Sequence, residues 1–199
     1  MESHGGEASM HETDIFYPAS QADWREWLEH HHQAKQAVWL VFYSKKSGRA
    51  SLSWSEAVDV ALCFGWIDSK KVKIDAETSR QFFSRRKPKS TWSKINKEKV
   101  QQLMDQGLMA PAGLDAIAIA KQNGSWELLD AAEALLIPDD LEKAFERYEG
   151  ARDYFVSLSK SDRKIMLTSL VLARRPETRQ KRIDEIAFWA GQQQKPKPL

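Results

Sequence analysis

The sequence predicts an α+β protein, in which a small three-stranded antiparallel sheet packs on helices and is followed by a predominantly α-helical C-terminal lobe. Three observations support this prediction. The run AVWLVFYS at residues 37–44 is aromatic and β-branched, as is typical of a buried strand. Residues 66–85 alternate in polarity around a turn at 75–79, which predicts a hairpin. From residue 93 onward, apolar residues recur at helical spacing.

Capping patterns and periodicity predict the helices in order. Residues 20–32 should form an amphipathic helix, because their large apolar residues share one face and Ser20 can cap its start. The sequence SWSE at 53–56 has the pattern of a capping box, and Gly65 can close that helix in a left-handed conformation. Further helices are expected at residues 93–107, 111–123, 125–136, 138–148, 151–158, 161–173 and 176–190.

These elements group into four regions. We expect residues 14–107 to form a mixed α+β region that carries a basic hairpin, and residues 108–191 to form a helical lobe packed on it. Residues 1–13 and 192–199 are polar and contain no periodic apolar residues, so we expect two disordered tails.

Charge is concentrated in one part of the chain. The whole sequence has a formal net charge of +2, whereas residues 70–99 contain eleven basic residues and three acidic ones. The single cysteine, Cys63, lies in an apolar run and cannot form an internal disulfide, which favours a reducing compartment. The start of the sequence has no signal-peptide pattern, and no apolar run is long enough to cross a bilayer. We therefore expect a cytoplasmic protein.

Known enzyme signatures are absent from the sequence. It contains no glycine-rich phosphate loop, no G-x-S-x-G, no H-E-x-x-H and no pair of cysteines. Residues 30–32 are three histidines, but adjacent helical residues point about 100° apart and cannot converge on one metal ion. We therefore expect no metal and no cofactor and assign no catalytic residue. Whether the protein is an enzyme is left open, with a non-enzyme favoured.

The basic hairpin supplies the candidate ligand site. Arginine forks suit phosphate or carboxylate groups, aromatic rings supply stacking surfaces, and Asp68 directly follows a strand start. In the alternative interpretation the hairpin is a solvated sheet edge, with Lys71 and Lys73 on the solvent face opposite Val72 and Ile74. The predicted ligand-binding residues are Trp66, Asp68, Arg80, Arg85, Arg86, Ser90, Trp92 and Asn96.

Five ordered motifs resemble the YdeI/OmpD-associated (bacteriocin-protection) family. They are ALCFGWIDS at 61–69, an Arg-aromatic strand ending in Ser84-Arg85-Arg86, SxWSxxN at 90–96, QGLMAPAGLDAI at 106–117 and PETRQKRI at 176–183. The resemblance runs from about Ile15 to Gly191. It implies a mixed sheet-and-helix domain with a helical tail, and it supplies no catalytic residue. One departure is the missing proline at Ser84-Arg85-Arg86, where the family typically has Ser/Thr-Pro-Arg.

The family's names imply protection against bacteriocins or cationic peptides and association with an outer-membrane porin. We therefore expect a non-enzymatic cytoplasmic binding protein of bacterial stress response or antimicrobial-peptide defence, with an anion-binding groove on the basic hairpin. Its partner would be an unidentified anionic ligand or a protein, and any link to a porin would be indirect. Two alternatives stay open. One is single-stranded nucleic-acid binding through the same hairpin, which is less favoured, and the other is an enzyme that uses Asp68 as an acid or base.

Overall fold

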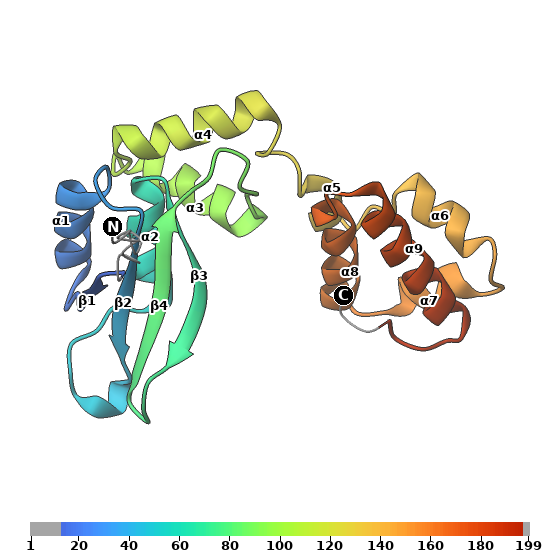
Figure 1. Cartoon of the computed structure of the whole chain (residues 1–199), viewed down its shortest axis with the longest axis horizontal. Coiled ribbons are helices and arrows are strands. Elements are labelled where there is room, and N and C mark those ends of the chain that lie inside the picture. Colours follow the sequence, from blue (N-terminus) through green and yellow to red (C-terminus); the bar gives the residue numbers. More distant parts are fainter. Residues whose placement is uncertain (1–12, 197–199) are drawn as a thin grey trace, which may run out of the picture. The chain divides into compact units, whose positions relative to one another are not determined.

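The computed structural model describes residues 13–196 (Figure 1). The chain divides into two compact units, Met1–Pro88 with Lys99–Ile119, and Lys89–Glu98 with Ala120–Leu199. Each unit is therefore discontinuous in sequence, whereas the predicted regions 14–107 and 108–191 are continuous. Of the predicted disordered tails 1–13 and 192–199, residues 1–12 and 197–199 lie outside the described residues. Residues 192–196 are described, and there Lys195 forms an ion pair with Asp162 at 2.5 Å, so this part of the predicted tail is held to the second unit.

A four-stranded sheet in the order β1-β2-β4-β3 forms the centre of the first unit. Its strands are β1 (Ile15–Phe16), β2 (Ala37–Tyr43), β3 (Trp66–Lys73) and β4 (Thr78–Arg85). The α+β class is confirmed, but the predicted count of three strands is wrong, because β1 adds a fourth strand parallel to β2. With two residues, β1 is too short to show an alternating pattern in the sequence.

Two helices, α1 (Gln21–His31) and α2 (Trp54–Cys63), cover one face of the sheet, which we call the inner face. Trp24 of α1 is fully buried and meets Phe83 of β4 edge to face, with ring centroids 5.5 Å apart. The Trp24 indole N–H donates to the carbonyl oxygen of Ala57 in α2 at 3.0 Å. This aromatic contact and this hydrogen bond join both helices to the sheet.

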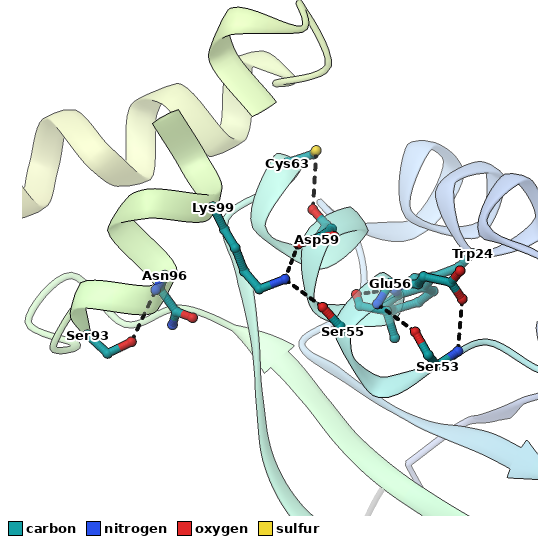
Figure 2. A network of polar contacts seen from close by, with 10 residues as sticks. Trp24, Ser53, Ser55, Glu56, Asp59, Cys63, Ser93, Asn96 and Lys99 are labelled. Carbon is teal, nitrogen blue, oxygen red and sulfur yellow. Dashed lines mark hydrogen bonds and ion pairs between the residues drawn. The ribbon is translucent and has the colours of Figure 1, made fainter. Parts of the chain in front are cut away.

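Capping fixes where these helices begin and end. The Ser20 side chain accepts a hydrogen bond from the backbone of Asp23, as predicted for the start of α1. At the start of α2, Ser53 and Glu56 form the predicted capping box (Figure 2). After α2, Gly65 has a φ of +71°, which confirms the left-handed end of this helix.

The strand register divides the side chains between the two faces of the sheet. Val38 pairs with Phe83, and both are fully buried on the inner face. Trp39 pairs with Phe82 on the opposite face, which we call the outer face. An irregularity in β3 between Asp68 and Lys71 keeps Lys71 opposite Gln81, on the inner face.

The ends of β3 and β4 nearest their turn extend past α1 and α2 (Figure 1). For this reason both faces of the hairpin are solvated there, and Val72 and Ile74 are 43% and 46% exposed. The alternation of Lys71 and Lys73 with Val72 and Ile74 is present, but it does not separate a buried face from a solvated one.

Two further helices are α3 (Lys94–Asp105) and α4 (Pro111–Asn123). In the second unit, the Ser93 hydroxyl accepts a hydrogen bond from the backbone of Asn96 at 3.2 Å, so Ser93 has its predicted capping role. In the first unit, Lys99 of α3 contacts α2, because its Nζ donates to Ser55 and forms an ion pair with Asp59 at 2.5 Å (Figure 2).

The second unit contains short helices packed around one apolar core. They are α5 (Asp130–Glu133), α6 (Asp139–Phe145), α7 (Ala151–Ser157), α8 (Lys160–Leu172) and α9 (Pro176–Gly191). Phe145 and Phe155 meet in this core at 5.3 Å between ring centroids. The predicted helix at 125–136 is wrong in length: only 130–133 is helical, because the backbone N–H of Trp126 donates back to Ala120 and residues 124–129 form turns.

Candidate functional site

A pocket of about 580 Å³ lies on the inner face of the sheet near the β3–β4 turn. We call it the hairpin pocket. It forms where the strands extend past the helices, so its floor is sheet and one wall is the first residue of α2. Its lining consists of Phe42, Tyr43, Ser44, Leu52, Trp54, Lys71, Lys73, Asp75, Ala76, Glu77, Thr78, Ser79 and Gln81.

Trp54 supplies a flat apolar wall. The capping box starts α2 at this residue, and the side chain is 52% exposed. Its indole N–H donates to Asp68 Oδ2 at 2.8 Å, and the same oxygen accepts from Gln81 Nε2 at 3.0 Å. Asp68 therefore fixes the orientation of two lining side chains from the edge of the pocket.

Lys71 and Lys73 supply the positive charge of the pocket. The bulge in β3 places both on the inner face, where they pair in register with Gln81 and Ser79. Neither ammonium forms a salt bridge with a carboxylate of residues 13–196. Both are therefore available to a negatively charged ligand.

Two carboxylates also line the pocket, at the turn. Asp75 Oδ1 accepts hydrogen bonds from the backbone N–H groups of Glu77 and Thr78, each at 2.8 Å. These hydrogen bonds, of which the one from Glu77 has the largest effect, hold the pKa of Asp75 below its ordinary value. The Asp75 carboxylate therefore stabilises the turn. Glu77 is exposed and is the carboxylate that would oppose an anion at the turn end of the pocket.

Three of the predicted site residues take different positions in the first unit. Asp68 lies beside the pocket and orients Trp54. Trp66 is fully buried against Trp24 and Trp27, with centroid distances of 6.5 and 5.8 Å, so its ring has no surface for a ligand. Arg80 lies on the outer face, between Val41 and Val72 in the register.

Arg85 and Arg86 lie near the other end of the hairpin. The Arg85 guanidinium donates to the backbone carbonyls of His32, at 2.7 Å, and of Gln33, and so satisfies carbonyls just after the end of α1. Arg86 is 9% exposed, and burial lowers its pKa to about 10, whereas the nearby Asp68 carboxylate raises it. Both arginines therefore have structural surroundings and do not line the hairpin pocket.

The other three predicted residues, Ser90, Trp92 and Asn96, belong to the second unit. Trp92 is buried, and its ring lies 5.0 Å from that of Trp126. The backbone N–H of Asn96 donates to the Ser93 cap. The residues of the predicted groove thus belong to both units. Of these eight residues, only Asp68 lies at the edge of the hairpin pocket.

Sequence reasoning missed Trp54, Gln81 and the position of Lys71 and Lys73 in the lining of the pocket. The sequence carries no signal for an exposed Trp54, because its i, i+3, i+4 and i+7 spacing with Ala57, Val58 and Ala61 predicts a place on the buried face of α2. The bulge that sets the face of Lys71 has no glycine or other marker in the sequence, so the position of this lysine could not be predicted.

The described residues contain neither a metal-binding cluster nor a membrane-spanning helix. No group of His, Cys, Asp and Glu side chains within residues 13–196 is arranged to hold a metal ion. None of the helices in that range is long and apolar enough to cross a membrane.

Fold and pocket together define an α+β protein with a hairpin pocket in one unit and a helical second unit. Residues 16–116 match the family model described as "Domain of unknown function (DUF8412)", which covers just over half of the chain, and the protein belongs to this family. Residues 134–193 match a second model, "Bacteriocin-protection, YdeI or OmpD-Associated". No curated protein and no solved structure matches the chain.

The resemblance to the YdeI/OmpD-associated family is thus confirmed over residues 134–193. Of the five motifs that suggested it, PETRQKRI lies in this segment, and the other four fall within residues 61–117. The description of this second model refers to bacteriocin protection.

Proposed function

We propose that this protein is a non-enzymatic binding protein of bacteriocin or cationic-peptide protection, and that its hairpin pocket takes an anionic small molecule. The observation that carries the proposal is that one pocket contains both Lys71 and Lys73 and the exposed ring of Trp54, which a hydrogen bond to Asp68 orients. Neither lysine forms a salt bridge within residues 13–196. The role in protection is supported by the description of the family that matches residues 134–193.

The chemistry of the lining defines the ligand class. The pocket volume of about 580 Å³ falls in the range typical of small-molecule sites, roughly 300–1,000 Å³. Two ammonium groups favour a phosphate or carboxylate, Trp54 favours a flat ring, and Gln81 with the nearby hydroxyls can orient polar substituents. The pocket therefore suits a small aromatic molecule that carries an acidic group.

The site differs from the predicted arginine groove in which cations it uses. Arg85 already donates to carbonyls after α1, and Arg86 is buried beside Asp68. Lys71 and Lys73 are exposed at the pocket, and Asp68 acts as a positioning residue for Trp54 rather than as an acid or base.

The test uses phenyl phosphate and benzoate as probes, with tryptophan fluorescence and thermal unfolding as readouts. Binding of at least one probe should weaken about tenfold or more in a Lys71→Met, Lys73→Met variant, because each charge-assisted hydrogen bond contributes about 1.5–3 kcal/mol. Lys45→Met, Lys46→Met is the matched control: it removes the same charge from exposed positions that do not line the pocket.

Equal probe affinity in the two double variants would contradict the assignment of the pocket. The cellular role is tested separately. Deletion of the gene should increase killing of the cells by a cationic bacteriocin, and expression of the protein should restore their survival. The protein should be found in the cytoplasmic fraction of these cells. The single buried cysteine supports that compartment. Unchanged survival of the deletion strain would contradict the role in protection.

A further inference from the structure

The outer face of the sheet carries an aromatic pair that the hairpin pocket does not use. Trp39 of β2 and Phe82 of β4 are cross-strand partners, with ring centroids 5.0 Å apart and an interplanar angle of 69°. Both are partly exposed, whereas the adjacent Phe83 points to the inner face and is fully buried. Adjacent rings on an open sheet face offer a surface on which flat groups can stack.

Cations lie directly over or beside the rings of this face. Lys70 Nζ is 5.4 Å from the ring centroid of Trp39 and 5.7 Å from that of Phe82. The guanidinium of Arg49 lies 4.8 Å from the Tyr43 centroid. Arg80 lies in the next row, and its Nε is buried without a hydrogen-bond partner in residues 13–196.

The strands themselves place no acidic side chain on the outer face, although the Asp75 carboxylate of the turn interacts electrostatically with Arg49. The three strands β2, β3 and β4 contain a single carboxylate, Asp68, and it lies on the inner face with Phe83. Lys70 and Arg80 take part in none of the salt bridges formed within residues 13–196. The outer face therefore combines stacking rings with the positive charges of Lys70 and Arg80, which form no salt bridge within the described residues.

We infer that this outer face binds single-stranded nucleic acid, through Trp39, Phe82, Lys70, Arg80, Tyr43 and Arg49. Phosphates complement the cations, and unpaired bases complement the rings. A duplex keeps its bases stacked inside and cannot use the ring pair, so the strand must be single. A base takes the place of the Lys70 ammonium over the rings, and that ammonium then pairs with a phosphate. This site lies on the opposite face from Lys71, Lys73 and Trp54, shares only Tyr43 with the lining of the hairpin pocket, and does not rest on the proposed function.

The test measures fluorescence anisotropy of a labelled oligothymidylate with the full chain, at low salt and at physiological ionic strength. Affinity should fall steeply with salt, and Trp39→Ala and Phe82→Ala should each weaken binding about tenfold. Lys70→Met should reduce the slope of log affinity against log salt by about one. Trp54→Ala, which removes an exposed tryptophan from the inner face, should leave the affinity unchanged.

Because Trp39→Ala can disturb the sheet, Lys70→Glu supplies a second variant that changes an exposed side chain. It should weaken oligonucleotide binding while the thermal unfolding midpoint stays that of the parent protein. The inference would be overturned if the protein bound no oligonucleotide, or if it bound the matching duplex with equal affinity. It would also be overturned if the double variant Lys71→Met, Lys73→Met lost binding and Lys70→Glu did not. Binding to anionic phospholipid vesicles without oligonucleotide binding would assign the face to a membrane surface and would overturn it equally.

Discussion

At the scale of single residues, Asp68 connects the hairpin pocket with the buried part of the first unit. One of its oxygens holds Trp54 and Gln81, and its charge offsets part of the desolvation of the Arg86 guanidinium. A buried cation without a nearby carboxylate costs several kcal/mol, so the carboxylate supports stability as well as pocket geometry.

Replacement of Asp68 by Asn should therefore destabilise the protein by about 1–3 kcal/mol, because the Arg86 charge loses its nearby carboxylate. Urea unfolding of Asp68→Asn, Arg86→Met and the double variant measures the coupling of the pair. The double variant should be more stable than the sum of the single effects predicts, by about 0.5 kcal/mol or more. Additive effects would show that the two residues do not interact.

At the scale of elements, the close approach of α4 to the end of α2 depends on one glycine. A Cβ atom at Gly113 would lie 2.2 Å from the carbonyl oxygen of Cys63, and the same oxygen accepts a hydrogen bond from Ala110 at 3.0 Å. This contact gives a physical reason for the glycine in the motif QGLMAPAGLDAI.

Gly113→Ala should destabilise the protein by about 1–3 kcal/mol, because backbone must move to admit the methyl group. Ala112→Gly is a useful comparison, since it changes a neighbouring position in the opposite sense and should cost about 1 kcal/mol through helix propensity alone. Urea unfolding of both variants checks this. A Gly113→Ala protein as stable as its parent would contradict the close approach.

In the second unit, Arg179 of α9 joins three helices. Its guanidinium forms a bidentate pair with Asp140 of α6, at 2.7 and 3.0 Å, and donates to the carbonyl of Leu170 in α8 at 2.9 Å. The hydrogen bonds from Arg179 hold the pKa of Asp140 below its ordinary value of 3.8. Because the folded-state pKa is the lower one, the pair stabilises the fold above the unfolded-state pKa and loses this effect as pH falls through the folded-state pKa.

The parent protein should therefore be more stable than Asp140→Asn at neutral pH, and this difference should shrink once the pH falls below about 4. Thermal unfolding midpoints measured at several pH values give the comparison. Asp139→Asn, at the preceding residue, is the control, because Asp139 forms no salt bridge within residues 13–196. A difference that stays constant on acidification would exclude the ion pair as its cause.

Much of the fold could be predicted from local patterns. The capping box at Ser53, the cap at Ser93 and the left-handed Gly65 were all correct, because each is set by side chains within a few residues. The strand β1 and the turns at 124–129 were not, because the first depends on a distant partner and the second on a backbone hydrogen bond from Trp126 to Ala120.

The candidate site was predicted less well than the fold. Composition drew attention to the hairpin, but charge counts cannot tell which cations already form hydrogen bonds within the folded chain. Arg85 is bound by carbonyls that lie more than fifty positions away, and the face of Lys71 depends on a bulge. The distribution of side chains between faces needs the register, which the sequence does not reveal.

At the scale of the whole molecule, two compact units correspond broadly to two family models. The model for residues 16–116 contains the sheet and the hairpin pocket, and the model for residues 134–193 contains α6 to α9. The description that mentions bacteriocin protection thus belongs to the helical part, whereas the proposed ligand site lies in the part described as a domain of unknown function. In our proposal, the first unit binds the anion and the second unit carries the role in protection.

The indole N–H of Trp54 offers the most direct test of the hairpin pocket. Its hydrogen bond to Asp68 fixes it at the pocket wall, so its NMR signal, assigned with Trp54→Phe, should report a bound ligand. On titration with phenyl phosphate, we predict a saturable shift of this signal that is lost in Lys71→Met, Lys73→Met and kept in Lys45→Met, Lys46→Met. A probe that binds the protein without moving the Trp54 signal, or moves it equally in both variants, would contradict the proposed site.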